Sequence, residues 1–309
     1  MQFLQRVSLL IVGCICTYIL LTLVLQQIPL DDDLNHCKPI IMNNTTYSLN
    51  THEHNIYMSL PTMTKKNEVA IIGHGKTQTH IDSIISLIKD SPESRDRYPG
   101  LEIPKSILLY GPPGTGKTTL ANKISDQIGF TFLHISPDMI ENKFYGEGIK
   151  KLRAVFTLAK KIAPTVVFFY EIDGFMSARS SMDQSHTNTM KTIFLTSMDT
   201  LSEIDRVLVI GATNRRDSLD AALLRRLDVQ LYMGFPSLDD KIIMIEKFFP
   251  KLSKDSQKEF VEYLGPGKSL SDIKNTCKTC MRILYTNKKD MHQVSLNDLT
   301  SMISDIPVQ

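Results

Sequence analysis

Short runs of apolar residues alternate along the middle of the chain with stretches in which apolar residues recur at helical spacing. The short runs predict buried strands at Ser106–Tyr110, Phe130–Ile135, Thr165–Tyr170 and Arg206–Ala212. The helical stretches include Thr118–Gln127 and Ile149–Lys161. Because strands and helices alternate, we expect an α/β fold with a parallel sheet. Beyond Pro236 the pattern is helical only, which predicts a small separate lid.

The N-terminal segment has a different pattern. Val7–Leu25 is an uncharged and mostly apolar run, which at about 1.5 Å per helical residue comes close to the roughly 30 Å hydrocarbon core of a bilayer. A cleaved signal peptide is the alternative, but its apolar region is usually about 7–15 residues long and ends at a small-residue cleavage site. Gln26–Pro29 lacks such a site. We therefore expect a membrane anchor over residues 1–28 and a polar linker over residues 29–62.

Composition and charge exclude few classes of function. A net charge of +2 and a hydrophobic content of 42% favour neither nucleic-acid binding nor disorder. Cys277 and Cys280 form one C-x-x-C pair, whereas a structural zinc site needs four ligands. We interpret the pair as part of an ordinary lid helix.

One motif carries the chemistry of the chain. Residues 111–119 satisfy the pattern G-x-x-x-x-G-K-[ST], in which glycines let backbone N–H groups line a concave anion site. A predicted strand precedes the motif and a predicted helix follows it, so the N-terminus of the helix faces the phosphates. Lys117 is placed to reach the terminal phosphates, and the Thr118 hydroxyl suits a Mg²⁺ ion. The predicted nucleotide site consists of Gly111, Pro112, Pro113, Gly114, Thr115, Gly116, Lys117, Thr118 and Thr119.

Further motifs surround this loop in a fixed order. The segments are, in order, LLYGPPGTGKTT, FFYEID, GATNRR and LDAALLRR. Their order and spacing are those of the AAA family of ATPases, which the chain resembles over roughly residues 63–300. KFYGEG after SPDMIEN resembles the branch that contains katanin, spastin and a membrane-anchored extractase of mislocalised tail-anchored proteins. That extractase also has an N-terminal span, a short linker and a single AAA module. The resemblance implies a P-loop NTPase fold, with a large α/β ATPase domain over 63–235 and a helical lid over 236–309.

The resemblance also implies a role for individual residues. Glu171 takes the place of the carboxylate that activates the attacking water, and Asn214 takes that of the sensor that holds this water or the γ-phosphate. Arg225 and Arg226 match arginine fingers, which reach the nucleotide of a neighbouring subunit and stabilise transition-state charge. The alternatives are a helix cap for Asn214 and a solvated basic pair for the two arginines.

Two further segments match the family. Ile72 and Gly73 fit the segment that contacts adenine through its backbone. Phe144 and Tyr145 match the pore loop that grips a translocating polypeptide. Two aromatic residues beside a glycine are also consistent with a position in the core, so both interpretations stay open.

Tyr170 departs from the family pattern. The family has an aspartate there, which orders Mg²⁺ through its water shell, whereas a phenol with a pKa near 10 is neutral at physiological pH. In the lid, Leu270 replaces a glycine that lies close to the nucleotide. Two functions therefore stay open: a membrane-anchored ATPase that extracts or translocates membrane polypeptides in tail-anchored protein quality control, and a degenerate module that binds ATP, hydrolyses it poorly and acts as a scaffold or regulatory subunit.

The resemblance implies ATP and Mg²⁺ as cofactors. It implies further copies of the chain in a hexamer, membrane polypeptides as substrates and no nucleic acid, while residues 7–25 would contact the bilayer. Arg6 before the span favours a cytosolic N-terminus, but an ATPase domain needs the compartment where ATP is plentiful, so we expect residues 29–309 in the cytosol. The expected membrane is the mitochondrial outer membrane, that of a reduced mitochondrion-like organelle, or the peroxisome, with the endoplasmic reticulum as the alternative.

Overall fold

The structure is a computed structural model that describes residues 38–42, 45–60, 75–90, 98, 100–140, 146–176, 184–288 and 294–304. Its internal contacts divide the chain into two units, Met1–Asn55 and Ile56–Gln309.

The described part of the first unit consists of a β-hairpin and the start of a helix. Strand β1 (Lys38–Met42) pairs antiparallel with β2 (Thr45–Leu49), and α2 (Thr51–Ser59) follows. The Glu53 backbone N–H donates to the Asn50 side chain at 2.8 Å, and the Asn50 N–H donates to the Glu53 carboxylate at 2.9 Å. This reciprocal pair satisfies free N–H groups at the start of α2. The segment that we expected to be a polar linker therefore contains regular structure.

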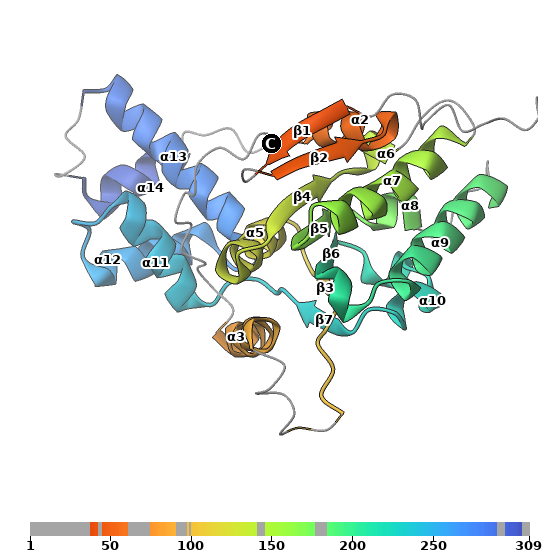
Figure 1. Cartoon of the computed structure of the whole chain (residues 1–309). Coiled ribbons are helices and arrows are strands. Elements are labelled where there is room, and N and C mark those ends of the chain that lie inside the picture. Colours follow the sequence, from red (N-terminus) through yellow and green to blue (C-terminus); the bar gives the residue numbers. More distant parts are fainter. Residues whose placement is uncertain are drawn as a thin grey trace, which may run out of the picture. The chain divides into compact units, whose positions relative to one another are not determined.

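Five strands form the sheet of the second unit, in the order β4-β5-β6-β3-β7 (Figure 1). All neighbouring pairs are parallel, so the carboxyl ends of the strands lie along one edge. The expected α/β fold with a parallel sheet is confirmed. The strands are β3 (Ser106–Tyr110), β4 (Thr131–Ile135), β5 (Thr165–Phe169), β6 (Val207–Thr213) and β7 (Val229–Tyr232).

Helices cover both faces of this sheet. Successive side chains of a strand point to opposite faces, and Phe168 and Phe169 show this directly. Phe168 lies in a core with residues of α3 and α5, whereas Phe169 packs edge-on against Phe194 of α9 with ring centroids 5.1 Å apart. The longer helices are α3 (Gly75–Lys89), α5 (Lys117–Ile128), α7 (Glu147–Lys161) and α9 (Gln184–Asp199). The short ones are α6 (Pro137–Ile140), α8 (Asp173–Met176) and α10 (Ala221–Leu224).

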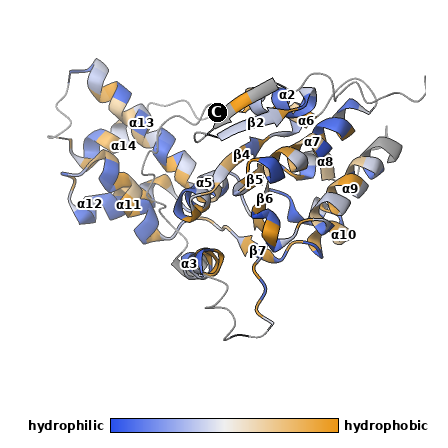
Figure 2. Ribbon diagram, in the orientation of Figure 1, coloured by the Kyte–Doolittle hydropathy of each residue, from blue (hydrophilic) through white to orange (hydrophobic). Residues whose placement is uncertain are grey.

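The C-terminal part is helical, as expected, and has a core of its own. This core buries residues of all its helices and includes the side chains of Cys277 and Cys280. In Figure 2, α11 and α13 carry both hydrophobic and hydrophilic colours, which is typical of helices with one buried face. The helices are α11 (Leu238–Phe248), α12 (Lys254–Leu264), α13 (Leu270–Thr286) and α14 (Leu296–Ser304).

The expected membrane anchor lies outside the residues that the structure describes. Among the helices that are described, none is both long enough and apolar enough to span a bilayer. The anchor at Val7–Leu25 therefore stays a prediction from the sequence.

Candidate functional site

The loop between β3 and α5 has a backbone that requires its glycines. Gly111, Gly114 and Gly116 have φ angles of 143°, 74° and 95°, which side chains of L-residues rarely allow. A Cβ atom on Gly111 would collide with the carbonyl oxygen of Met233, and one on Gly114 would collide with the hydroxyl of Ser269. The loop therefore needs glycine both for its conformation and for its close packing against the segment after β7 and the lid.

Lys117, the first residue of α5, places a cation inside this loop. The side chain is only 9% exposed. Its ammonium group donates hydrogen bonds to the carbonyl oxygens of Gly111 at 2.9 Å and Pro112 at 2.8 Å. Burial lowers the pKa of Lys117, while the negative charges of Asp173 and Glu171 act in the opposite direction. The positive charge thus lies between the loop and two carboxylates.

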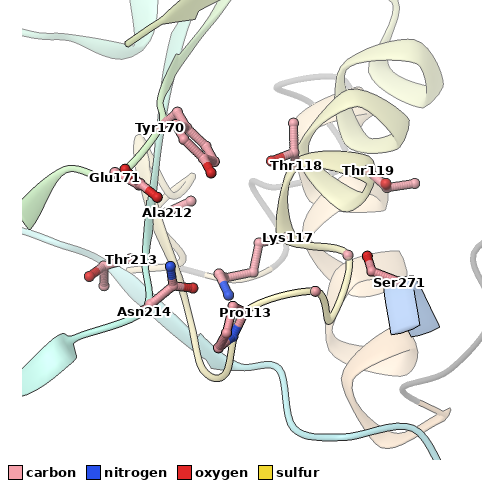
Figure 3. A pocket seen from close by; sticks show the side chains of 12 residues that line it. Pro113, Lys117, Thr118, Thr119, Tyr170, Glu171, Ala212, Thr213, Asn214 and Ser271 are labelled. Carbon is pink, nitrogen blue, oxygen red and sulfur yellow. The ribbon is translucent and has the colours of Figure 1, made fainter. Parts of the chain in front are cut away.

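Tyr170 and Glu171 directly follow β5. Glu171 has a φ of 49°, a left-handed conformation that is uncommon for residues other than glycine. Its carbonyl oxygen accepts a hydrogen bond from the Gly174 N–H at 2.8 Å, which closes a tight turn into α8. Figure 3 shows the side chains of Tyr170 and Glu171 at one cavity with Lys117.

The end of β6 forms the other side of the site. The Thr213 hydroxyl donates to the Asp173 carboxylate at 2.6 Å and accepts from the backbone N–H of Arg215 at 2.9 Å. This bond ties the end of β6 to the start of α8. Asn214 follows Thr213 directly, so its position is fixed by the same contacts.

These segments line an open cavity of about 200 Å³ (Figure 3). Ser271 of the lid helix α13 also lines it, and its backbone N–H donates to the carbonyl oxygen of Gly114 at 3.2 Å. The structure thus brings together the loop, the ends of two strands and the lid. The lining residues are Pro113, Gly114, Gly116, Lys117, Thr118, Thr119, Tyr170, Glu171, Ala212, Thr213, Asn214 and Ser271.

The residues of this cavity fit a nucleoside triphosphate. The glycine loop, the buried ammonium of Lys117 and the N-terminus of α5 together provide positive potential for phosphates. Magnesium takes oxygen ligands and commonly binds through few protein groups together with substrate phosphates. The Thr118 hydroxyl lines the cavity and fits that role, whereas Tyr170 offers a neutral phenol beside it.

The arginine pair lies away from this cavity. Among the described residues that line it, neither Arg225 nor Arg226 occurs. Arg226 donates to the Asp199 carboxylate at 2.8 Å and to the carbonyl oxygen of Ala222 at 3.1 Å. Arg225 ends the short helix α10 and is exposed. The structure therefore separates the two arginines, one held within the chain and one facing solvent.

Four expected site residues lie outside the described part of the chain. They are Ile72, Gly73, Phe144 and Tyr145, and their roles stay predictions. Conversely, Ala212, Thr213 and Ser271 line the cavity although they were not among the expected site residues. A hydroxyl residue at the end of an otherwise apolar strand, directly before Asn214, was the available signal for Thr213.

Comparison with known proteins identifies relatives of this domain. Residues 107–235 match the family described as "ATPase family associated with various cellular activities (AAA)". The outer mitochondrial transmembrane helix translocase of Xenopus tropicalis is 35% identical over 226 residues, covering 68% of this chain and 62% of the relative. The human protein of that name is 36% identical over 182 residues, covering 58% and 50%. Spastin of Ixodes scapularis is 32% identical over 252 residues, covering 76% and 38%.

The chain thus spans between 38% and 62% of the length of these relatives. A solved structure is also similar: the crystal structure of the FIGL-1 AAA domain in complex with ADP. It has a TM-score of 0.64 and 26% sequence identity, and the match covers 83% of this chain and 92% of that one.

Proposed function

The chain carries an ATPase domain of the AAA family, and from this premise we propose that it is a membrane-anchored ATPase that extracts membrane polypeptides. One observation carries the proposal of hydrolysis. Lys117, Glu171 and Asn214 come from a loop and two separate strand ends, and all three line one cavity. A cation, a carboxylate and an amide gathered at a phosphate-binding loop suit the transfer of a phosphoryl group to water.

In the proposed reaction, the phosphates of ATP lie on the loop backbone and against Lys117. Glu171 accepts a proton from the attacking water, and Asn214 holds that water or the γ-phosphate in position. Lys117 stabilises the charge that develops on the phosphate oxygens. Mg²⁺ would be held by Thr118 and would neutralise phosphate charge.

We further propose that the site is shared between copies of the chain, arranged as a hexamer. Arg225 and Arg226 do not line the cavity of their own chain. Arg225 is exposed on the surface of the domain. It would be able to reach the nucleotide of a neighbouring copy, where it would stabilise transition-state charge. Ile72 and Gly73 would contact the adenine of the same nucleotide.

The proposed extraction of a polypeptide from the membrane is supported by the names of similar proteins and by two segments of the sequence, residues 7–25 and the pair Phe144 and Tyr145. Proteins that are 35–36% identical are named outer mitochondrial transmembrane helix translocases. We propose the same membrane and a similar substrate for this chain, with residues 7–25 as the anchor. Phe144 and Tyr145 would grip the polypeptide by packing against its side chains, which requires no particular sequence.

A module that binds ATP and hydrolyses it poorly is the alternative. Tyr170 is the observation that favours it, because the phenol brings no charge to the metal. The comparisons give this alternative no support.

The proposal is tested with the full chain reconstituted in liposomes that hold a tail-anchored test polypeptide. We expect ATP-dependent release of the polypeptide, together with hydrolysis of ATP. Glu171→Gln should bind ATP but neither hydrolyse it nor release the polypeptide, and Glu246→Gln on the exposed face of α11 is the matched control. Tight ATP binding without measurable hydrolysis by the parent chain would instead favour the binding module.

The anchor and the pore loop each need a separate variant. Deletion of residues 1–28 should move the protein from floating liposomes to the soluble fraction and end extraction. Replacing Phe144 and Tyr145 together by alanine should sharply lower the amount of polypeptide extracted per ATP hydrolysed. An unchanged ratio would remove the pore loop from the proposed mechanism.

A further inference from the structure

The ring of Tyr170 packs against an aromatic side chain of the neighbouring strand of the sheet. It contacts the ring of His134 on the neighbouring strand β4, with ring centroids 6.0 Å apart. His134 in turn stacks on Phe168 at 5.4 Å, and Phe168 is fully buried in β5. This row of rings packs against one side of the Tyr170 ring.

The hydroxyl itself is at the catalytic cavity and not in the core. Tyr170 is 39% exposed and lines the same cavity as Glu171. In Figure 3 its hydroxyl points into the cavity with Lys117, Thr118 and the Glu171 carboxylate around it. Burial, and to a lesser degree the neighbouring Glu171, raises the pKa of Tyr170. The hydroxyl therefore keeps its proton at neutral pH and is a hydrogen-bond donor to a carboxylate.

We propose that Tyr170 is a positioning residue for Glu171, whose carboxylate it holds in the orientation that accepts the proton of the attacking water. This proposal rests on the proposed ATPase function. The left-handed backbone of Glu171 fixes the start of its side chain, and a hydrogen bond from the Tyr170 hydroxyl would fix its carboxylate end. A hydrogen bond to a charged carboxylate is stronger than one between neutral groups. An aspartate at position 170 would instead repel the neighbouring carboxylate.

The variant Tyr170→Phe distinguishes this proposal from the view that Tyr170 is only an uncharged replacement for the aspartate of the family. Phenylalanine keeps the ring and its contact with His134 but removes the hydroxyl. We expect kcat to fall about tenfold, in the range of a lost hydrogen bond to a charged group, with the KM for ATP within about twofold, because the hydroxyl does not bind ATP. Tyr285→Phe, on a lid side chain that is 87% exposed, is the matched control.

If Tyr170 were only a missing aspartate, phenylalanine and tyrosine would be equivalent, because neither carries a charge. An unchanged kcat in Tyr170→Phe would therefore overturn the proposal. A raised kcat would also overturn it, because the hydroxyl would then restrain Glu171 unproductively.

A second measurement does not depend on hydrolysis. In full-length protein labelled with ¹³C at tyrosine Cζ, the signal that disappears in Tyr170→Phe belongs to Tyr170. Glu171→Gln should shift this signal at neutral pH, whereas Glu246→Gln should not. A signal that stays in place in Glu171→Gln would contradict the pairing of the two side chains.

The two measurements separate this proposal from the proposed function. A shifted signal in a parent chain that hydrolyses no ATP would refute the ATPase function and with it the catalytic role of the pair. Normal hydrolysis by both the parent chain and Tyr170→Phe would keep the ATPase function and refute the positioning role.

Discussion

Among single residues, we expect Lys117 to determine how the cavity recognises an anion. Its buried ammonium group contacts two carbonyl oxygens of the loop. These contacts hold the positive charge inside the loop, where the phosphate oxygens of ATP would bind. We expect Lys117→Ala to weaken ATP binding by about 10- to 100-fold, the range for hydrogen bonds to charged groups. Titration calorimetry on the full chain measures this. Lys123→Ala, further along the same helix, removes an equal charge and should leave the affinity unchanged. Equal affinity in Lys117→Ala would show that the phosphates bind elsewhere.

We expect Tyr170 also to affect the binding of Mg²⁺, through its lack of charge and not through its hydroxyl. An aspartate at this position would add a negative charge beside Thr118. We expect Tyr170→Asp to lower the Mg²⁺ concentration at half-maximal ATP binding, because Mg²⁺ favours carboxylate oxygen. The uncharged Tyr170→Asn is the matched control and should not do so. The same midpoint in both variants would mean that another group already supplies the charge, and Asp173 would be the first candidate.

Among the elements, the lid helix α13 is expected to make the stability of the protein depend on pH. Burial raises the pKa of Cys277 to about 12 and that of Cys280 to about 11, from an ordinary value of 9.0. The unfolded chain therefore loses these protons first as pH rises. The stability that the buried thiols contribute is complete below pH 9 and is lost as pH rises towards 11 and 12.

Urea unfolding at two pH values measures this effect. Between about pH 8 and pH 10, the two thiols should reduce the free energy of unfolding by up to about 3 kcal/mol. A double variant, Cys277→Ala with Cys280→Ala, should lack this part of the pH dependence, whatever its stability at pH 8. The same loss in both proteins would show that other groups titrate in this range.

The elements also show what the sequence could predict. The bounds of β3 agree with the expected strand, because its apolar residues lie between Lys105 and the glycine loop that starts at Gly111. By contrast, β7 was not predicted, since among its four residues only Leu231 is buried. Helix α9 was missed because serine, threonine and asparagine dilute its apolar pattern. Both elements depend on packing against distant parts of the chain, which no local pattern records.

The same distinction applies to the site. The glycine loop is continuous in sequence, so its conformation could be predicted from nine consecutive residues. The bond between Thr213 and Asp173 joins positions that are 40 residues apart, and only the parallel pairing of β5 with β6 brings them together. The support of Tyr170 by His134 likewise comes from strand order.

At the scale of the whole molecule, we propose that the arginine pair connects one copy of the chain with the next. Arg226 is held by Asp199 in an ion pair whose side chains are 36% and 50% exposed. Exposed ion pairs contribute little to stability, so a phosphate of a neighbouring copy could displace Asp199 at little cost. Arg225 is exposed already. We therefore expect Arg225 to be the finger that reaches the neighbour most directly.

Mixing of variants tests this arrangement. Arg225→Ala has an intact cavity but lacks the finger, and Lys117→Ala has the finger but a damaged cavity. Each should hydrolyse ATP poorly alone. In rings formed from equal amounts of both, about a quarter of the interfaces pair an intact cavity with an intact finger, since cyclic assemblies repeat one interface. We expect the ATPase rate of the mixture to recover towards that fraction of the parental rate.

The control for this experiment combines two variants that both damage the cavity. Mixtures of Lys117→Ala with Glu171→Gln contain no interface with an intact cavity, so their rate should stay at the level of the separate proteins. Recovery in the first mixture and none in the second would place the finger and the cavity on different copies of the chain. If no mixing ratio of Arg225→Ala with Lys117→Ala restores hydrolysis, although the two proteins assemble together, Arg225 does not act on a neighbour. The basic pair would then be a solvated part of the surface, and the cavity would have to stabilise the transition state with Lys117 as its nearest cation.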